Sequence, residues 1–200
     1  MSEILESLFS SKERVRILRF FLQNPEATFT SAEISRRNML KPLKIRREIE
    51  MLSKIKFILK STQKDKISYR LNQNFDFYPE MKNLFSRANT SPQCKSLARV
   101  ANLGSVKLAV ISGVFINYQK SKADMILVGD NISKARLNNL MSSLEAEIGK
   151  EINFVLMTME EFKYRLNMLD KFILEFLEGP HEEVINKIVG LKQFIAKRKL

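Results

Sequence analysis

Residues 31–71 read SAEISRRNMLKPLKIRREIEMLSKIKFILKSTQKDKISYRL, a pattern that indicates a helix, a tight turn, a basic helix and two short strands. Hydroxyl side chains at the start of this stretch can cap the first helix, and Asn38 and Met39 supply the turn. Pro42 suits the first turn of the second helix because its missing N–H costs no hydrogen bond there. The stretch therefore predicts two helices joined at a tight corner.

The second helix, from about Lys41 to Ile55, has two chemically different sides. The side predicted to face inward carries Ile45, Ile49, Leu52 and Ile55 at helical spacing. The opposite side carries Leu43, Arg46, Arg47, Glu50, Ser53 and Lys54. Residues 57–63 and 67–71 are rich in β-forming types, and the run Lys64-Asp65-Lys66 between them predicts a hairpin turn.

An apolar helix is expected ahead of this stretch, at residues 12–23. Its core face consists of Val15, Leu18, Phe21 and Leu22. A basic helix held by a preceding helix can lie in the major groove of DNA, while a strand pair reaches the neighbouring phosphates. Residues 7–71 resemble, in their pattern, the winged helix-turn-helix domains of prokaryotic transcriptional regulators. The resemblance implies that this half of the chain binds double-stranded DNA.

The positions of the basic residues indicate where DNA contacts are expected. On the second helix, the candidates for base and phosphate contacts are Lys41, Lys44, Arg46 and Arg47. Arg36 and Arg37 are expected to touch the DNA backbone, and Lys60, Lys64 and Lys66 to reach phosphates or the minor groove. Because arginine pairs bidentately with guanine, Arg46 and Arg47 are the expected specificity residues. The alternative is a solvated basic face with no role in DNA binding.

Charge is distributed unevenly along the 200 residues, whose formal net charge is +12. Residues 1–95 carry 19 lysines and arginines against 10 aspartates and glutamates, and residues 96–200 carry 15 against 12. A basic half attracts polyanions, of which nucleic acid is the commonest. An anionic membrane surface is a weaker alternative, because the chain has no tryptophan-bearing amphipathic helix.

Cys94 is the only cysteine, so no internal disulfide can form and a reducing compartment is expected. Together with the single His181 it cannot build a zinc site of the usual kind, and we expect no metal and no cofactor. No apolar run is long enough to span a membrane, and Glu3 and Glu6 interrupt any signal-peptide pattern. The sequence therefore predicts a cytoplasmic protein without membrane contact.

The pattern divides the chain into residues 1–75, a helical linker at 76–104 and a second domain at 105–200. Within the linker, Pro79 begins one helix, the polar run at 88–94 connects, and Gly104 ends a further helix. Beyond Gly104, strand and helix patterns alternate. Three strands are expected at 106–112, 125–128 and 151–157, and an amphipathic helix at 132–148 that ends at Gly149.

Three more helices are expected toward the C-terminus. Thr158 and Glu161 form a capping box for the first, and Gly179-Pro180 ends the second, which carries residues 172–177. The third is expected at about 182–197, with Val184, Ile188 and Leu191 on one side. One winged helix covers a small DNA site, so a homodimer is expected, with the helices at 79–87 and 182–197 as its pairing surfaces.

Three segments of the second half carry another resemblance: VKLAVISG at 106–113, SKADMILVGD at 121–130 and EINFVLMTMEEF at 151–162. Over roughly residues 105–185 the chain resembles the minimal nucleotidyltransferase fold, and FILEFLEGP at 172–180 looks like the tail of that family. A winged helix ahead of such a domain is similar to a known group of prokaryotic transcriptional regulators. The implied fold is α+β, an N-terminal winged helix-turn-helix followed by a small α/β nucleotidyltransferase-like domain.

Active members of that family need a Gly-Ser pair after the first strand and an Asp-x-Asp at the second. Glycine lets phosphate approach closely, and the carboxylates hold divalent metals. Here Val114 follows Gly113, and Lys122 stands in place of the first aspartate, so that only Asp124 remains of the pair. Neutral Asn153 lies where a third carboxylate is usual. The sequence therefore predicts a catalytically inactive domain.

Gly113, Lys122 and Asp124 remain candidates for binding a nucleotide or other small-molecule anion as an effector. In the simpler interpretation Gly113 is a turn residue and Asp124 pairs with Lys122. The sequence predicts a dimeric, sequence-specific DNA-binding transcriptional regulator whose second domain serves dimerisation or effector sensing. Two alternatives stay open. One is an active nucleotidyltransferase docked by the winged helix, with a metal site of Asp124, Asp130 and Glu151, and the other is a protein-interaction scaffold.

Overall fold

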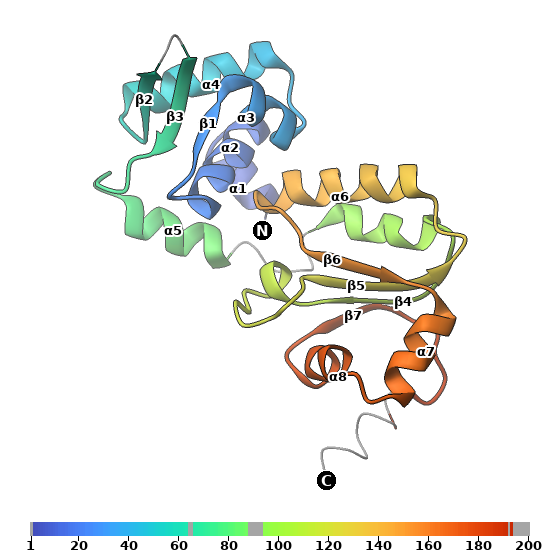
Figure 1. The fold of residues 1–200 in the computed structure, drawn as a ribbon. Helices are drawn as coiled ribbons and strands as arrows, with labels where there is room; N and C mark the ends of the chain where they lie inside the picture. Colours follow the sequence, from blue (N-terminus) through green and yellow to red (C-terminus); the bar gives the residue numbers. More distant parts are fainter. Residues whose placement is uncertain (1, 64–65, 88–93, 192, 194–200) are drawn as a thin grey trace. The chain divides into compact units, whose positions relative to one another are not determined.

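The computed structural model describes residues 2–63, 66–87, 94–191 and 193, and its fold is mixed α+β (Figure 1). The chain forms two compact units. The first comprises Met1–Cys94 and Ser142–Glu151, and the second comprises Lys95–Met141 and Ile152–Leu200. The polar connection expected at 88–94 lies outside the described residues except for Cys94. Among the described residues, no helix combines the length and the apolar character needed to cross a membrane.

The first unit contains the elements predicted for residues 31–71. Its helices and strands are α1 (Ser2–Leu8), α2 (Lys12–Gln23), β1 (Thr28–Thr30), α3 (Ser31–Asn38), α4 (Pro42–Lys54), β2 (Ile58–Gln63), β3 (Lys66–Leu71) and α5 (Tyr78–Arg87). The expected order of helix, turn, helix and two strands is confirmed. Strand β1 is an addition, because the sequence analysis took this segment only for a helix cap.

The strands of the first unit form one antiparallel sheet in the order β1-β3-β2. Phe29 pairs with Tyr69, and Ile58 pairs with Leu71. Phe29, Ile58 and Leu71 are all buried. Cross-strand partners lie on the same face of a sheet, so this face packs on the core and the other faces solvent.

Helices α2 and α4 supply most of the core beneath this sheet. From α2, Phe20 and Phe21 pack against Phe29, with ring centroids 4.5 and 6.3 Å from it. From α4, the buried residues are Ile45, Ile49 and Leu52. The fourth residue expected to face inward, Ile55, is 49% exposed. That expectation is wrong because the helix ends at Lys54, and Ile55 lies outside its regular turn.

Side-chain caps determine where α3 begins. The hydroxyl of Thr30 accepts the N–H of Glu33, and the carboxylate of Glu33 accepts the N–H of Thr30 at 2.7 Å. This reciprocal capping box lowers the pKa of Glu33, chiefly through the backbone bond to Thr30. At the other end, Met39 adopts a left-handed conformation with φ +51° and makes the expected turn toward Pro42.

The C-terminal end of α6 (Lys134–Ile148) belongs to the first unit and contacts α2. The guanidinium of buried Arg19 donates to the carbonyl oxygen of Glu147 at 2.7 Å, and the amide of Asn24 donates to that of Gly149 at 2.6 Å. Gly149 has φ +84°, and a Cβ there would lie 3.0 Å from the backbone nitrogen of Phe20. Glycine is therefore required where α6 ends, as the sequence predicts.

The second unit is built on a four-stranded sheet. Its elements besides α6 are η2 (Lys95–Asn102), β4 (Ser105–Ile111), η3 (Gly113–Phe115), β5 (Met125–Asp130), β6 (Phe154–Met157), α7 (Met159–Asn167), α8 (Lys171–Glu178) and β7 (Glu182–Asn186). The strand order is β6-β5-β4-β7. Strand β5 runs antiparallel to β4 and parallel to β6, and β7 runs antiparallel to β4. The three expected strands are confirmed, although β6 begins three residues later than expected.

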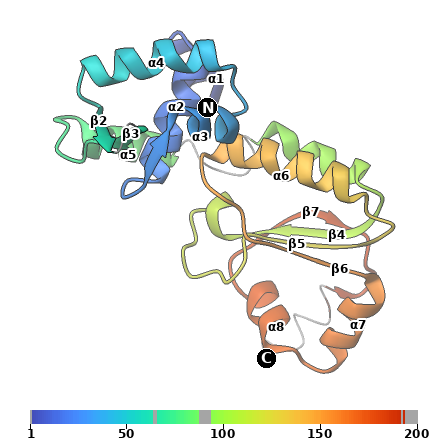
Figure 2. The same cartoon turned by 45° about the horizontal axis from the view of Figure 1, so that its top comes forward.

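Helices cover both faces of this sheet (Figure 2). One face carries α6, whose Leu137 and Leu140 are buried as the sequence predicts. The other carries α7 and α8, whose Phe162 and Ile173 pack with Leu108 of β4 and other buried residues of the sheet. Because β4 and β5 are buried on both faces, they read as nearly continuous apolar runs in the sequence.

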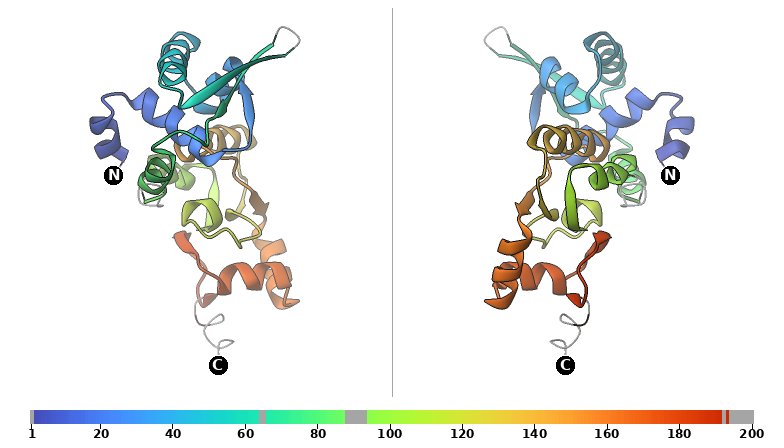
Figure 3. Two further views of the ribbon diagram at one scale, coloured as in Figure 1. Left: turned by 90° about the vertical axis from the view of Figure 1, so that its left-hand side faces the viewer. Right: turned by 90° about the vertical axis from the view of Figure 1, so that its right-hand side faces the viewer.

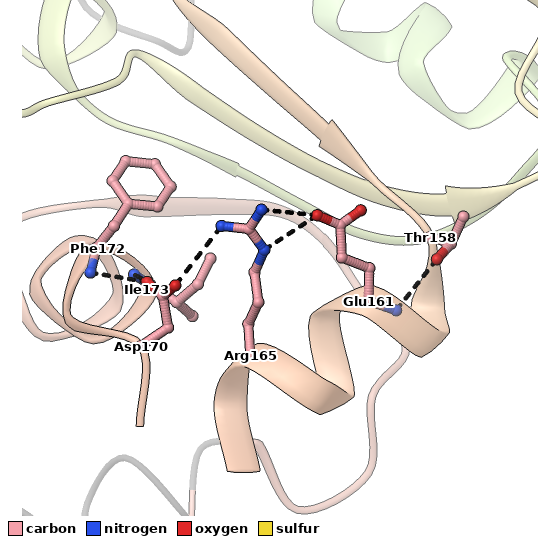
Figure 4. Close-up of polar contacts among 6 residues, drawn as sticks. All are labelled: Thr158, Glu161, Arg165, Asp170, Phe172 and Ile173. Carbon is pink, nitrogen blue, oxygen red and sulfur yellow. Dashed lines mark hydrogen bonds and ion pairs between the residues drawn. The ribbon is translucent and has the colours of Figure 1, made fainter. Parts of the chain in front are cut away.

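A set of charged residues holds the corner between α7 and α8 (Figure 4). Arg165 donates to Glu161 at 2.8 and 3.0 Å and lies 3.6 Å from the carboxylate of Asp170. The other oxygen of Asp170 accepts the N–H groups of Phe172 and Ile173 and so caps α8. In addition, the N–H of Glu161 donates to the hydroxyl of Thr158. Thr158 is therefore confirmed as the N-cap of α7.

The predicted helix over 182–197 is wrong in its first part. Glu182–Asn186 forms β7, in which Ile185 pairs with Ala109 of β4. The outer edge of β4 carries N–H and C=O groups that need partners, and pairing with β7 satisfies them. A helix was predicted here because the apolar residues from Val184 onward recur at helical spacing. Residues 192 and 194–200 of the expected helix lie outside the described residues.

Replacing Thr30 by alanine removes the hydroxyl that caps α3. We expect the free energy of unfolding to fall by about 1 kcal/mol, the usual cost of losing an N-cap. Urea denaturation followed by circular dichroism measures the change. Ser31→Ala is the matched control, because Ser31 is an exposed neighbouring hydroxyl residue. Equal unfolding midpoints for the two variants would contradict the capping role.

Candidate functional site

Helix α4 turns one side toward solvent. Its buried residues, Ile45, Ile49 and Leu52, all lie on the opposite side. At about 100° of rotation per residue, the outward side is made by Leu43, Arg47, Glu50 and Lys54. All four side chains are exposed. The helix therefore presents one apolar residue and both signs of charge on a single outward surface.

A second side of α4 contacts α2, so its side chains are less accessible to an external ligand than those of the outward side. Lys44 forms an ion pair with Glu13, and this hydrogen bond lowers the pKa of the Glu13 carboxyl. Glu48 accepts hydrogen bonds from the hydroxyl of Ser11 at 3.2 Å and from Arg14 at 2.9 Å. These contacts set the rotation of α4 about its own axis. Lys44, predicted to contact DNA, already has a carboxylate partner.

The other basic residues predicted on this helix differ in what they contact. Arg46 donates to Glu50, one turn later, at 3.2 Å. Arg47 has no hydrogen-bond or ion-pair partner in the part of the chain that the structure describes. Lys41 is the exposed residue just before the helix and makes no side-chain cap bond. Of the four candidates, Arg47 and Lys41 therefore carry uncompensated charge.

The β2–β3 hairpin projects away from the helices of its unit (Figure 3). Lys60 pairs with Tyr69, and Lys66 pairs with Gln63. Because side chains alternate between faces, Lys60 and Lys66 lie on opposite faces of the hairpin. Lys66 shares the solvent face with Arg70, four residues later and also exposed. Arg70 was not among the predicted contacts, although its even spacing from Lys66 on a strand indicates a shared face. Lys64 lies outside the described residues.

Arg36 and Arg37 end α3, as predicted, but their side chains have different surroundings. Arg37 lies over the ring of Phe29, 5.2 Å from its centroid, and pairs with Glu151. Arg36 is exposed. Both arginines line a cavity of about 210 Å³ together with Glu145 and other residues of the first unit. Arg37 is therefore engaged inside the first unit.

In the second unit, Asp124 holds the backbone together. Its side chain is 7% exposed, and its two carboxylate oxygens accept the N–H groups of Val114 and Asn153, at 2.9 and 2.8 Å. These bonds tie the loop after β4 to the start of β6. Gly113 has φ +52°, and a Cβ on it would lie 1.9 Å from Asp124 Oδ1. Gly113 is therefore a turn residue that leaves room for the carboxylate.

Lys122 does not pair with Asp124, and that expectation is wrong. Its ammonium donates to Glu175 of α8 at 2.7 Å, which lowers the pKa of the Glu175 carboxyl. Both members of the pair line a cavity of about 400 Å³. The rest of its lining includes Ser112, Tyr118, Lys120, Ser121, Phe172 and Phe176. Of the three residues predicted to bind an anion, only Lys122 belongs to this lining.

Each carboxylate of the alternative enzymatic interpretation has a partner of its own. Asp130 accepts the N–H of Met159 at 3.3 Å, Glu151 pairs with Arg37 in the first unit, and Asp124 is bonded as described. Within the described ranges, no three histidine, cysteine, aspartate or glutamate side chains are grouped so that they could hold a metal ion. The arrangement of Asp124 is that of a structural anchor rather than a metal ligand.

No family model, curated protein or solved structure matches this chain.

The substitution Asp124→Asn tests the anchoring role. An amide replaces one acceptor oxygen with a donor, so one backbone N–H at Val114 or Asn153 loses its partner while buried. We expect the free energy of unfolding to fall by about 1–3 kcal/mol. Lys122→Gln is the control, since it removes only an exposed ion pair and should change the unfolding midpoint little. Thermal unfolding of both variants measures the difference. An unchanged Asp124→Asn protein would rule out the anchor.

Proposed function

We propose that this protein is a transcriptional regulator that binds double-stranded DNA through a winged helix-turn-helix. In this proposal α4 is the recognition helix and the β2–β3 hairpin is the wing. The observation that carries it is the outward side of α4, where Arg47 is exposed and has no partner among the described residues. A guanidinium in the major groove pairs bidentately with guanine. No carboxylate among the described residues competes for Arg47.

The charge around α4 supports the same proposal. Lys41 precedes the helix, and Lys66 and Arg70 lie on the solvent face of the hairpin. Such cations neutralise phosphates and position a protein on the duplex without reading sequence. Lys44 and Arg37 play a secondary role in this proposal, because each would have to exchange a carboxylate partner for a phosphate. Surface ion pairs contribute only about 0–1 kcal/mol, so such an exchange is affordable.

For the second unit we propose a nucleotidyltransferase-like domain without transferase activity. Metal-dependent transfer requires carboxylates that can turn toward a metal ion. Asp124 would first have to release two backbone N–H groups. The alternative of an active enzyme therefore demands a rearrangement of the loop after β4. The proposal assigns the domain to regulation rather than to chemistry.

The regulator is proposed to act as a homodimer. A two-fold dimer doubles the DNA site that one winged helix covers. The helix expected at 182–197 no longer supports this, since its first part is strand β7. The other predicted pairing surface, α5, supports the dimer because Leu84 is exposed on it. The edge strand β6 is a further surface, since Phe154 and Leu156 are exposed on it. No charged residue interrupts β6 from Phe154 to Met157.

An anionic effector is proposed to enter the 400 Å³ cavity of the second unit rather than the expected site at Gly113 and Asp124. Its wall carries Lys120 and Lys122 together with the carboxylates of Glu175 and Glu178, and Phe172 and Phe176 supply apolar surface. Glu175 is paired with Lys122, so Lys120 is the lysine offered to an anion. A nucleotide has an anionic group for the lysine and an apolar face for the phenylalanines. Asp124 is not part of this lining, so the proposed site is separate from the carboxylate that the enzymatic alternative would use.

The function is tested by sequencing the fragments of genomic DNA that the full-length protein retains at physiological salt. We expect a recurrent site with two-fold symmetry. Arg47→Ala should relax specificity at one position of each half-site, at a cost of about 1–3 kcal/mol. Lys66→Ala should instead weaken all sequences alike and reduce the salt dependence.

The control is Lys163→Ala, which removes the same charge from exposed α7. It should leave the preferred sequence unchanged. Retention without sequence preference that disappears as salt rises would mean that only backbone attraction exists. That result would overturn the proposal in favour of the enzyme or scaffold alternative. A recurrent site without two-fold symmetry would overturn only the dimer.

Calorimetry with ATP tests the effector. We expect binding at millimolar ATP. Lys120→Ala should weaken it, because Lys120 lines the cavity and makes none of the ion pairs formed by the described residues. Lys163→Ala, an exposed lysine on α7 that is absent from the cavity lining, is the control. No heat at millimolar ATP would remove the nucleotide from the proposal.

A further inference from the structure

Leu43 is exposed, whereas the isoleucines and the other leucine of the same helix are buried. It is the second residue of α4, and its side chain is 68% exposed. The isoleucines and the leucine at 45, 49 and 52 are almost completely buried in the same helix. Single exposed leucines are common on protein surfaces and need no explanation by themselves. What distinguishes Leu43 is its place on the outward side of α4.

Leu43 and Arg47 are neighbours on that side, because residues four apart lie one above the other on a helix. Arg46 and Glu50 flank them as an ion pair, and Lys44 is bound to Glu13 on another side. Recognition helices contact base edges mainly with their N-terminal residues. An apolar side chain therefore stands beside a free guanidinium at the end of α4 that would enter the groove first.

The major groove of DNA offers an apolar side chain one distinctive partner, the 5-methyl group of thymine. We infer that Leu43 is a specificity-determining residue that contacts this methyl group, next to a guanine bound by Arg47. The inference rests on the proposed DNA-binding function and names part of its target. A contact with thymine would also account for an exposed leucine on a helix that is otherwise rich in lysine and arginine.

Helix geometry limits where the thymine lies. Four residues rise about 6 Å along a helix, and base pairs are stacked about 3.4 Å apart. The thymine is therefore expected within about two base pairs of the guanine that Arg47 reads. Each half-site should then contain one thymine whose methyl group matters and others whose methyl groups do not.

The experiment replaces each thymine of the recovered site, one at a time, by deoxyuridine, which lacks only the 5-methyl group. Affinity of the full-length protein is measured for every duplex by fluorescence anisotropy. At one thymine per half-site we expect about a three- to fivefold loss, the effect of uncovering one methyl-sized apolar group. Leu43→Ala should bind the thymine and uracil duplexes equally.

Leu8→Ala is the matched control, because Leu8 is a leucine on α1 with a similar exposed fraction, 65%. It should retain the full thymine preference. If no uracil substitution weakens the wild type, or if Leu43→Ala loses as much as the wild type does, the inference is wrong while DNA recognition stands. If the wild type yields no recurrent site at all, the proposed function and this inference both fail.

Discussion

The burial of one side of α4 is the constraint on which the interpretation of the first unit depends. Ile45, Ile49 and Leu52 are driven into the core by the hydrophobic effect, and this fixes the rotation of the helix about its axis. Contacts from α2, such as that of Arg14 with Glu48, hold the same rotation. This rotation decides which side chains of α4 face solvent. A helix rotated by one residue would present Lys44 instead of Leu43.

The second unit depends in a comparable way on a single carboxylate. Asp124 is buried and satisfied by two backbone N–H groups, one from the loop after β4 and one from the start of β6. A buried carboxylate is stable only when such donors surround it. Having those partners, it is poorly placed to bind a metal ion as well. In the sequence Asp124 resembles one residue of a catalytic motif. In the fold it links two backbone segments by hydrogen bonds.

The elements that could be predicted are those with a local cause. The reciprocal cap between Thr30 and Glu33 and the spacing of apolar residues in α4 both operate within a few residues. Strand β7 could not be predicted in this way, because its apolar residues fit a helix as well as a strand. Pairing with the edge of β4, more than 70 residues earlier, decides in favour of the strand. Propensity gives way when a distant hydrogen-bonding edge is available.

By itself the sequence determined the order of helices α2, α3 and α4 and strands β2 and β3, the excess of positive charge in that half, and the presence of Lys122 rather than a second carboxylate near Asp124, just before β5. These depend on residue type and short-range spacing. Only the tertiary structure decided which basic side chains have a carboxylate partner and which have none among the described residues. Ion pairs join Lys44 to Glu13, Arg37 to Glu151 and Lys122 to Glu175, and the two partners of each pair are far apart in the sequence. Such partners are set by how helices pack, because charges interact strongly only when folding brings them within a few ångströms.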